Sequence, residues 1–263
     1  MDRECLLAAT GWTEIDACAG KKRRKGRRLL IWGDSHSGVY HRSLRSIGKE
    51  LGWAITTITY NGCPPLVGVH RVDDDRRAAW CTEEESEKVI RFIERNPFDA
   101  IILTARFGMY ERGWHVNGKL VRHRTHFLAD GRSRGKNAKE SRAALRRGLL
   151  RTGKRLAKQR LIVALPTPEM PKAPKKDRTR KLGIDRAAYL EQRRFIERVL
   201  RELPESVTVF DPIDAVCDAK RCPGWASNEP MYNDDNHLSE AGHRRLAPLL
   251  RAQLEAVAPA KPR

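Results

Sequence analysis

Short apolar runs alternate along the chain with longer segments in which apolar residues recur at helical spacing. Five runs have the length and continuity of buried strands: 28–33, 54–60, 100–104, 161–165 and 207–210. Five segments place apolar residues on one face of a helix: 36–51, 82–96, 138–158, 185–203 and 239–257. Strands that alternate with helices pair in parallel and are covered on both faces. The pattern therefore predicts an α/β protein, a three-layer α/β/α sandwich around a five-stranded parallel, flavodoxin-like sheet.

Some segments fall outside this pattern. Residues 1–26 have little apolar periodicity and end in a basic run, so we expect a poorly ordered lead-in. The folded domain is then expected over residues 27–257, with a tail at 258–263. Residues 105–136 are polar, basic and irregular, and a loop of this length in a compact domain is often functional or disordered.

Composition narrows the class of protein. The chain has 263 residues, 40% of them hydrophobic, which is enough for one α/β domain with a sizeable core. The net charge of +19 suggests an anionic partner, but much of it lies in three loop-like stretches: 21–28, 122–139 and 172–181. These stretches lack the interleaved aromatic residues of single-strand-binding platforms, so no nucleic-acid partner is expected. No apolar run approaches the ~18 residues of a membrane span, and no secretory signal is visible at the N-terminus.

The first predicted strand ends in Gly33-Asp34-Ser35, just before a predicted helix. In open parallel sheets, ligands bind at the carboxyl ends of the strands, and the N–H groups at a helix N-terminus favour a developing negative charge. Ser35 is therefore a candidate nucleophile. The simpler interpretation is an ordinary strand-to-helix turn, in which Ser35 or Asp34 caps the helix.

Partners for this serine lie near the other end of the chain, before the last predicted helix. A serine hydroxyl needs a base within hydrogen-bond reach, and the base needs an orienting group. His237 can be the base, and Asp234, three residues earlier, would share its face in a helical turn and hold the imidazole. Taken alone, His237 is as readily a surface histidine and Asp234 a turn residue. Together with Ser35 they predict a Ser-His-Asp triad.

These motifs resemble those of the SGNH (GDSL-like) hydrolase superfamily. The resemblance is strongest to the SGNH domain joined to acyltransferase-3 membrane proteins, which O-acetylate cell-surface polysaccharides. It rests on residues 31–36 (Ile-Trp-Gly-Asp-Ser-His), 62–66 (Gly-Cys-Pro-Pro-Leu) and 232–242, and it spans about residues 27–255.

The resemblance implies a role for each of these residues. Ser35 would be the nucleophile, His237 the base and Asp234 its orienter. The N–H groups of Ser35 and Gly62 would bind the oxyanion. The implied reaction is acyl-ester chemistry through an acyl-serine, with transfer to a carbohydrate hydroxyl or hydrolysis, and it needs neither a cofactor nor a metal. The substrate would be an acylated carbohydrate or a small acyl donor.

One departure from the family pattern concerns the oxyanion hole. Typical SGNH hydrolases carry Gly-x-Asn after the third strand, whereas residues 104–110 here read Thr-Ala-Arg-Phe-Gly-Met-Tyr. The acyltransferase-linked branch has a similar Ala-Arg-aromatic run, which agrees with that assignment. Loss of one oxyanion donor typically costs about 2.7–4 kcal/mol of transition-state stabilisation, so either Arg106 substitutes or turnover is slow. An ordinary salt bridge is the alternative role for Arg106.

Three further residues in the motif segments at the strand ends are candidates for contacting the substrate: Asn61, Tyr110 and Tyr232.

The six cysteines form no CxxC pair and no standard zinc spacing. The branch resemblance implies that Cys63 pairs with Cys81 and Cys217 with Cys222, and reduced thiols are the alternative. Disulfides require an oxidising compartment, and the family places this domain outside the cytoplasmic membrane, in the periplasm or beyond. Because no export signal is visible, we expect a truncated or separately encoded piece that associates with an acyltransferase-3 membrane domain.

Other interpretations stay open. The missing Asn favours a catalytically weak or inactive SGNH domain that binds an anionic glycan. The net charge favours a polyanion- or nucleic-acid-binding protein, whose affinity would fall steeply with salt. His115, His123 and His126 invite a metal interpretation, but without a nearby carboxylate or cysteine their spacing is more simply incidental.

Overall fold

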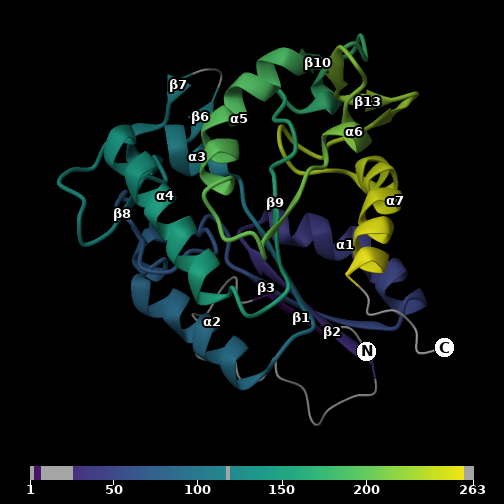
Figure 1. The fold of residues 1–263 in the computed structure, drawn as a ribbon. Coiled ribbons are helices and arrows are strands. Elements are labelled where there is room, and N and C mark those ends of the chain that lie inside the picture. The colour runs from purple at the N-terminus through teal and green to yellow at the C-terminus, as the bar shows by residue number, and fades with distance from the viewer. Residues whose placement is uncertain (1–2, 7–25, 117–118, 258–263) are drawn as a thin grey trace.

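The computed structural model describes residues 3–6, 26–116 and 119–257, and its sheet lies between two helical layers (Figure 1). Within these residues, six strands form the sheet in the order β1-β3-β2-β5-β9-β11, and every pairing is parallel. Their bounds are β1 Arg3–Leu6, β2 Arg27–Gly33, β3 Trp53–Thr59, β5 Ala100–Thr104, β9 Leu161–Ala164 and β11 Thr208–Phe210. The predicted fold is confirmed, because the five predicted strands follow the order 2-1-3-4-5 of a flavodoxin-like sheet.

The sixth strand, β1, lies at the edge of the sheet and was not predicted. It pairs in parallel with β3, with Arg3 opposite Thr56. Four residues are too few to show an apolar period. The partner for the backbone hydrogen bonds of this strand is β3, which is distant in the sequence. Most of the predicted lead-in, and the predicted tail at 258–263, lie outside the described residues.

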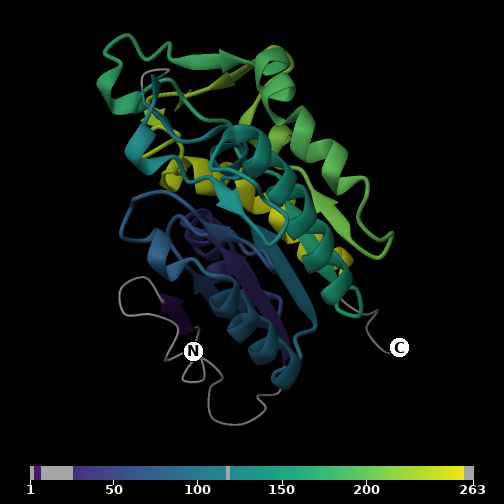
Figure 2. The ribbon, with the colours of Figure 1, turned by 90° about the vertical axis from the view of Figure 1, so that its left-hand side faces the viewer.

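Two sets of helices cover opposite faces of the sheet. One set consists of α2 Glu83–Arg95, α4 Ala138–Arg155 and α5 Arg186–Leu200, and the other of α1 His36–Glu50 and α7 Glu240–Ala256. Residues of β2 alternate between the faces: Leu30 and Trp32 join the core under the first set, and Leu29 and Ile31 join the second. Figure 2 shows α4 and α5, in teal and green, side by side.

Two helices begin at capping hydroxyl groups. The Thr82 hydroxyl accepts a hydrogen bond from the Glu85 N–H at the start of α2. The Ser239 hydroxyl accepts one from the Gly242 N–H at the start of α7. These bonds satisfy helix N–H groups that otherwise lack a partner.

Residues 105–136, expected to be irregular, contain several short helices and strands. They form helix α3 Phe107–Arg112, strands β6 His115–Val116, β7 Lys119–Leu120 and β8 Leu128–Ala129, and a 3-10 turn at Arg122–Arg124. Strand β8 pairs with β4 His70–Arg71. The prediction was wrong because apolar residues scattered among the basic ones, such as Phe107 and Leu128, are fully buried.

Short elements complete the described chain: η2 Ala78–Trp80, η4 Pro174–Lys176, β10 Gly183–Asp185, α6 Ile213–Val216, β12 Arg221–Pro223, β13 Trp225–Ala226 and β14 Glu229–Pro230. The disulfides Cys63–Cys81 and Cys217–Cys222 are both present, which confirms the pairing implied by the family resemblance. None of the helices in the described ranges has the length and hydropathy of a membrane span.

Candidate active site

Ser35 lies at the junction of β2 and α1, at the carboxyl edge of the sheet. Strand β2 ends at Gly33, and Ser35 is the N-cap of α1. A Cβ at position 33 would lie 2.1 Å from the carbonyl oxygen of Thr104, at the end of the neighbouring strand β5. Glycine therefore permits the close approach of the two strand ends. The approach keeps Ser35 beside the loop that follows β5.

Ser35, His237 and Asp234 come together in the structure, although 202 positions separate the serine from the histidine. The Nε2 atom of His237 lies 2.8 Å from Ser35 Oγ, and its Nδ1 lies 2.7 Å from Asp234 Oδ2. Asp234 Oδ1 accepts hydrogen bonds from the backbone N–H groups of Asn236 and His237, at 2.8 and 2.7 Å. Because an ionised carboxylate only accepts hydrogen bonds, His237 Nδ1 carries the proton, and Nε2 can accept a hydrogen bond from the Ser35 hydroxyl.

The charges around His237 suit a general base. Burial alone would lower the pKa of His237, but the hydrogen bond and negative charge of Asp234 raise it above the usual 6.5. Burial alone would raise the pKa of Asp234, but hydrogen bonds from His237 and Asn236 bring it well below its usual range. Asp234 is therefore ionised at neutral pH, and its charge would stabilise an imidazolium at His237.

Asp34 organises the backbone around Ser35, a role that the sequence suggested only as a helix cap. Its carboxylate is buried and accepts three hydrogen bonds of 2.9 Å, from the His36 N–H, the Arg106 N–H and the Tyr110 hydroxyl. The bond from Arg106 ties the loop after β5 to the serine turn. Tyr110 is fully buried in this arrangement. Its predicted contact with substrate is therefore wrong.

Tyr232 requires the same correction. It is fully buried, forms a bridge with Leu238 and packs in the core beside α7, so a substrate cannot reach it. Its burial depends on the packing of remote segments, which a motif does not reveal. Asn61, the third predicted substrate-binding residue, does line the cavity that contains Ser35.

Two backbone N–H groups are free to bind an oxyanion. Those of Ser35 and Gly62 donate to no acceptor within the described residues, and both residues line the same cavity. Gly62 has a φ of 75°, which favours glycine, and its carbonyl accepts a hydrogen bond of 3.1 Å from Arg71 Nη1. That bond anchors the peptide that follows Gly62, and the Gly62 N–H, which belongs to the preceding peptide, is left unused.

The Arg106 side chain also lines the cavity. Its Nη2 lies 2.5 Å from Glu169 Oε2 and 3.8 Å from Asp235 Oδ2. Burial alone would raise the pKa of Glu169, but the charge of Arg106 lowers it, so the pair is ionic. Among the described residues, Nη1 of Arg106 has no acceptor. Nε of Arg106 also has no partner among these residues but is buried, so Nη1 is the candidate donor to a substrate oxygen.

Sequence reasoning missed several residues of this site. His36 Nε2 lies 3.1 Å from Asn236 Oδ1, and the His36 ring centroid lies 5.1 Å from that of His237. Burial lowers the pKa of His36, so this imidazole is neutral. His36 follows Ser35 in the sequence, and Asn236 precedes His237. Their adjacency to the triad residues was the only signal that could have identified them. Glu169 lies shortly after β9, at another strand end where site residues were expected.

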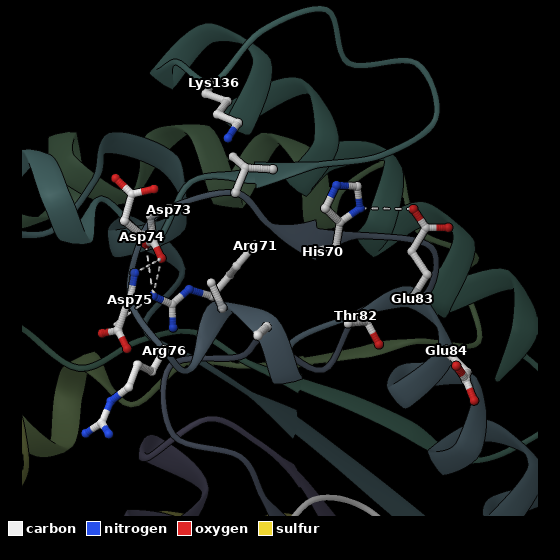
Figure 3. A pocket seen from close by; sticks show the side chains of 13 residues that line it. His70, Arg71, Asp73, Asp74, Asp75, Arg76, Thr82, Glu83, Glu84 and Lys136 are labelled. Carbon is white, nitrogen blue, oxygen red and sulfur yellow. Dashed lines mark hydrogen bonds and ion pairs between the residues drawn. The ribbon is translucent and has the colours of Figure 1, made fainter.

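These residues surround an open cavity of about 710 Å³, within the usual size of small-molecule sites. The triad lines it together with side chains from residues 105–126 and 169–176. Another hollow, of about 880 Å³, lies around the turn at Asp73–Asp75 (Figure 3). No residue of the triad lines that hollow. The first cavity is therefore the candidate active site.

Comparisons with known proteins identify the family of this chain. A family model described as an SGNH domain fused to AT3 domains matches residues 4–252. No curated protein matches the chain.

Among solved structures, the periplasmic domain of a lipopolysaccharide acetyltransferase from Salmonella ser. Paratyphi A is similar, with a TM-score of 0.61 and 16% identity over 92% of this chain and 87% of that one. A family two carbohydrate esterase from Clostridium thermocellum has a TM-score of 0.49 and 8% identity, over 89% and 65% of the two chains. At 16% identity, the likeness to the Salmonella domain shows a shared fold. Because the family model covers nearly the whole chain, the protein belongs to the family of SGNH domains that are fused to AT3 domains.

Proposed function

We propose that this protein is an SGNH-type O-acyltransferase or esterase that works through an acyl-Ser35 intermediate on O-acyl groups of a cell-surface glycan. The observation that carries the proposal is the hydrogen-bonded chain from Ser35 Oγ through His237 to Asp234, at 2.8 and 2.7 Å. Unused N–H groups and an open cavity supply the other requirements of acyl transfer.

In the first half-reaction, Ser35 Oγ attacks the ester carbonyl carbon while His237 Nε2 takes the hydroxyl proton. The carbonyl oxygen becomes an oxyanion, which accepts hydrogen bonds from the N–H groups of Ser35 and Gly62. The tetrahedral intermediate then collapses. The bond to the leaving alkoxide breaks, and the alkoxide takes the proton from His237, which leaves acyl-Ser35 and a free alcohol.

The second half-reaction repeats these steps with a new nucleophile. A glycan hydroxyl, or water, attacks acyl-Ser35 and gives its proton to His237 Nε2. Ser35 Oγ leaves and takes that proton back, so the enzyme returns to its starting state. Exclusion of water from the cavity determines whether the acyl group reaches a glycan or is hydrolysed.

Arg106 is the proposed third oxyanion donor, in place of the missing Asn. Its Nη1 has no acceptor among the described residues, while Nη2 is held by Glu169. A cationic donor that is already oriented by a carboxylate costs little reorganisation when the oxyanion forms. The charge and the fixed position of Arg106 would thus offset the loss of the amide.

The proposal includes a location outside the cytoplasmic membrane and an acyltransferase-3 membrane domain as partner. Two disulfides support this location, since disulfides persist in oxidising compartments and are rare in the cytosol. Family members are fused to AT3 domains by description, and the similar Salmonella domain is periplasmic by name. The membrane domain would deliver the acyl group and this domain would pass it to a glycan.

The test is labelling with a fluorophosphonate and turnover of p-nitrophenyl acetate. Wild type should be labelled once, at Ser35, and Ser35→Ala should lose both labelling and turnover, the latter by at least about a thousandfold. Ser206→Ala, at an exposed serine outside the cavity, is the matched control and should behave as wild type. Equal turnover in wild type and Ser35→Ala would overturn the proposal.

A further inference from the structure

The cavity at Ser35 has cationic side chains that the triad does not use. Five of its lining side chains are cationic and three are carboxylates. The carboxylates are engaged, because Asp234 pairs with His237, and Arg106 lies within 4 Å of the other two. Four cations have no carboxylate partner among the residues that line the cavity: Arg77, Arg124, Lys172 and Lys176.

Arg124 is held in a fixed orientation. Its Nε donates to Asp75, and its guanidinium carbon lies 4.9 Å from the centroid of the Trp114 ring. The ring orients the guanidinium plane, and Asp75 occupies only one edge of it. Nη1 and Nη2 donate to no acceptor in the described part of the chain. Such a pair of oriented donors matches the two oxygens of a carboxylate or phosphate.

The carboxylates behind Arg124 do not neutralise the arginines that they bind. Asp75 accepts from Arg77 at 3.4 Å as well as from Arg124. Arg71 donates to both oxygens of Asp73, at 2.7 and 2.9 Å, and also lies 3.8 Å from Asp75 (Figure 3). Three guanidinium groups thus share two carboxylates, so this cluster keeps a positive charge next to the cavity.

His126 adds a neutral hydrogen-bond acceptor close to Arg124. Its Nδ1 lies 3.0 Å from the Arg124 carbonyl oxygen, so Nδ1 donates and Nε2 is left as an acceptor. Burial and the positive charge of Arg71 lower its pKa to about 4, which keeps the imidazole neutral. A Cβ on Gly62 would lie 3.1 Å from Nε2, which puts this atom beside the proposed oxyanion donors.

The backbone of His126 is strained, with a φ of 60°. Such a conformation is uncommon for a residue other than glycine, and strain of this kind clusters at ligand sites. The backbone N–H of His126 donates to Asp73, which belongs to the same cluster as Arg71 and Arg124. Asp73 and Asp75, which pair with Arg71, therefore fix the positions of Arg124 and His126.

We propose that Arg124 and His126 form a subsite for an acidic sugar. Nη1 and Nη2 of Arg124 bind an anionic substituent of the sugar, a carboxylate or a phosphate, and His126 Nε2 accepts a hydrogen bond from a neighbouring ring hydroxyl. The inference rests on the proposed function, because it names the class of glycan on which Ser35 acts. It also assigns a function to the positive charge of segment 105–136.

Binding to the Ser35→Ala variant tests the subsite without any turnover. Calorimetry would compare galacturonate with its neutral methyl ester and with galactose 6-phosphate. One oriented charged pair should make at least one of the acidic sugars bind about tenfold tighter than the methyl ester, and the excess should shrink with salt. The tighter of the two acids identifies the anionic group.

Arg124→Gln, made in the same background, should remove the excess for the acid. Arg132→Gln changes an exposed arginine of the same basic segment that lines neither hollow, and it should keep the excess. Equal affinity for all three sugars, or an excess that survives in Arg124→Gln, would overturn the inference. If Arg124→Gln fails to fold, the salt titration of the parent variant still decides. Because no nucleophile is present, this result is independent of whether Ser35 reacts with a fluorophosphonate.

Discussion

Removing one oxygen atom from Tyr110 should destabilise the protein, whereas the same change at Tyr232 should not. Both tyrosines are fully buried, so phenylalanine fills the same space and leaves no new cavity. The Tyr110 hydroxyl donates to Asp34 at 2.9 Å, and the Tyr232 hydroxyl has no partner among the described residues. The two substitutions therefore separate the effect of one hydrogen bond from the effect of packing.

The magnitude follows from the charge on the acceptor. A hydrogen bond to a charged group contributes about 1.5–3 kcal/mol, and Tyr110→Phe leaves Asp34 with its bonds from His36 and Arg106. We expect the free energy of unfolding to fall by about 2 kcal/mol, which for a chain of this size lowers Tm by roughly 4–8 °C. In Tyr232→Phe an unpaired buried hydroxyl is lost, so Tm should stay the same or rise.

Thermal unfolding followed by circular dichroism, with the disulfides intact, measures the difference. Urea unfolding gives the same comparison at constant temperature, provided that both variants keep the wild-type m-value. Because Asp34 also ties the Arg106 loop to the serine turn, p-nitrophenyl acetate turnover should fall in Tyr110→Phe. The reasoning is refuted if the two variants lose equal stability, or if Tyr232→Phe loses more.

Four further predictions concern the site and the disulfide beside it. Because His237 is a base only when neutral and its pKa is raised above 6.5, kcat/KM should rise with pH around a midpoint above 6.5, and a lower midpoint would contradict this. The raised pKa of His237 also contributes to the free energy of unfolding. This contribution is complete below the pKa of the unfolded state and is lost as pH rises through the pKa of the folded state, and urea unfolding at several pH values measures it. Replacing Cys63 and Cys81 by serine opens a loop of 18 residues, so urea unfolding should report a loss of roughly 3 kcal/mol, and an unchanged midpoint would contradict it. Arg106→Gln should lower kcat by about 10²–10³-fold if its guanidinium binds the oxyanion, while Glu169→Gln, which keeps that donor, should lower it less; an equal loss in both variants would contradict the assignment.

The other disulfide supplies the control for the cysteine prediction. Cys217 and Cys222 are separated by only 5 positions and lie outside the cavity. Loop-closure entropy then predicts a loss smaller by about 1 kcal/mol when this pair is replaced by serine. Turnover should fall only when the Cys63 pair is removed, because Cys63 adjoins the Gly62 oxyanion donor.

Strands β2, β5 and β9 could be predicted because they are buried on both faces over most of their length and therefore read as continuous apolar runs. The edge strand at Arg3–Leu6 carries no such signal, since its pairing is supplied by β3. The prediction that segment 105–136 is irregular was wrong for a related reason. Its basic residues dominate the local pattern, while its few apolar side chains bury against segments that are remote in the sequence.

What the sequence determined by itself is local: the strand and helix periods, and the chemistry of the residues at the strand ends. Those features depend on residues a few positions apart, so they can be read along the chain. Only the tertiary structure decided which tyrosine hydroxyl meets Asp34, 76 positions away, and which arginines keep unused donors at the cavity. Burial and pairing depend on groups that only the fold brings together. For this reason the motifs pointed to Ser35, His237 and Asp234 but not to most of the residues that surround the cavity.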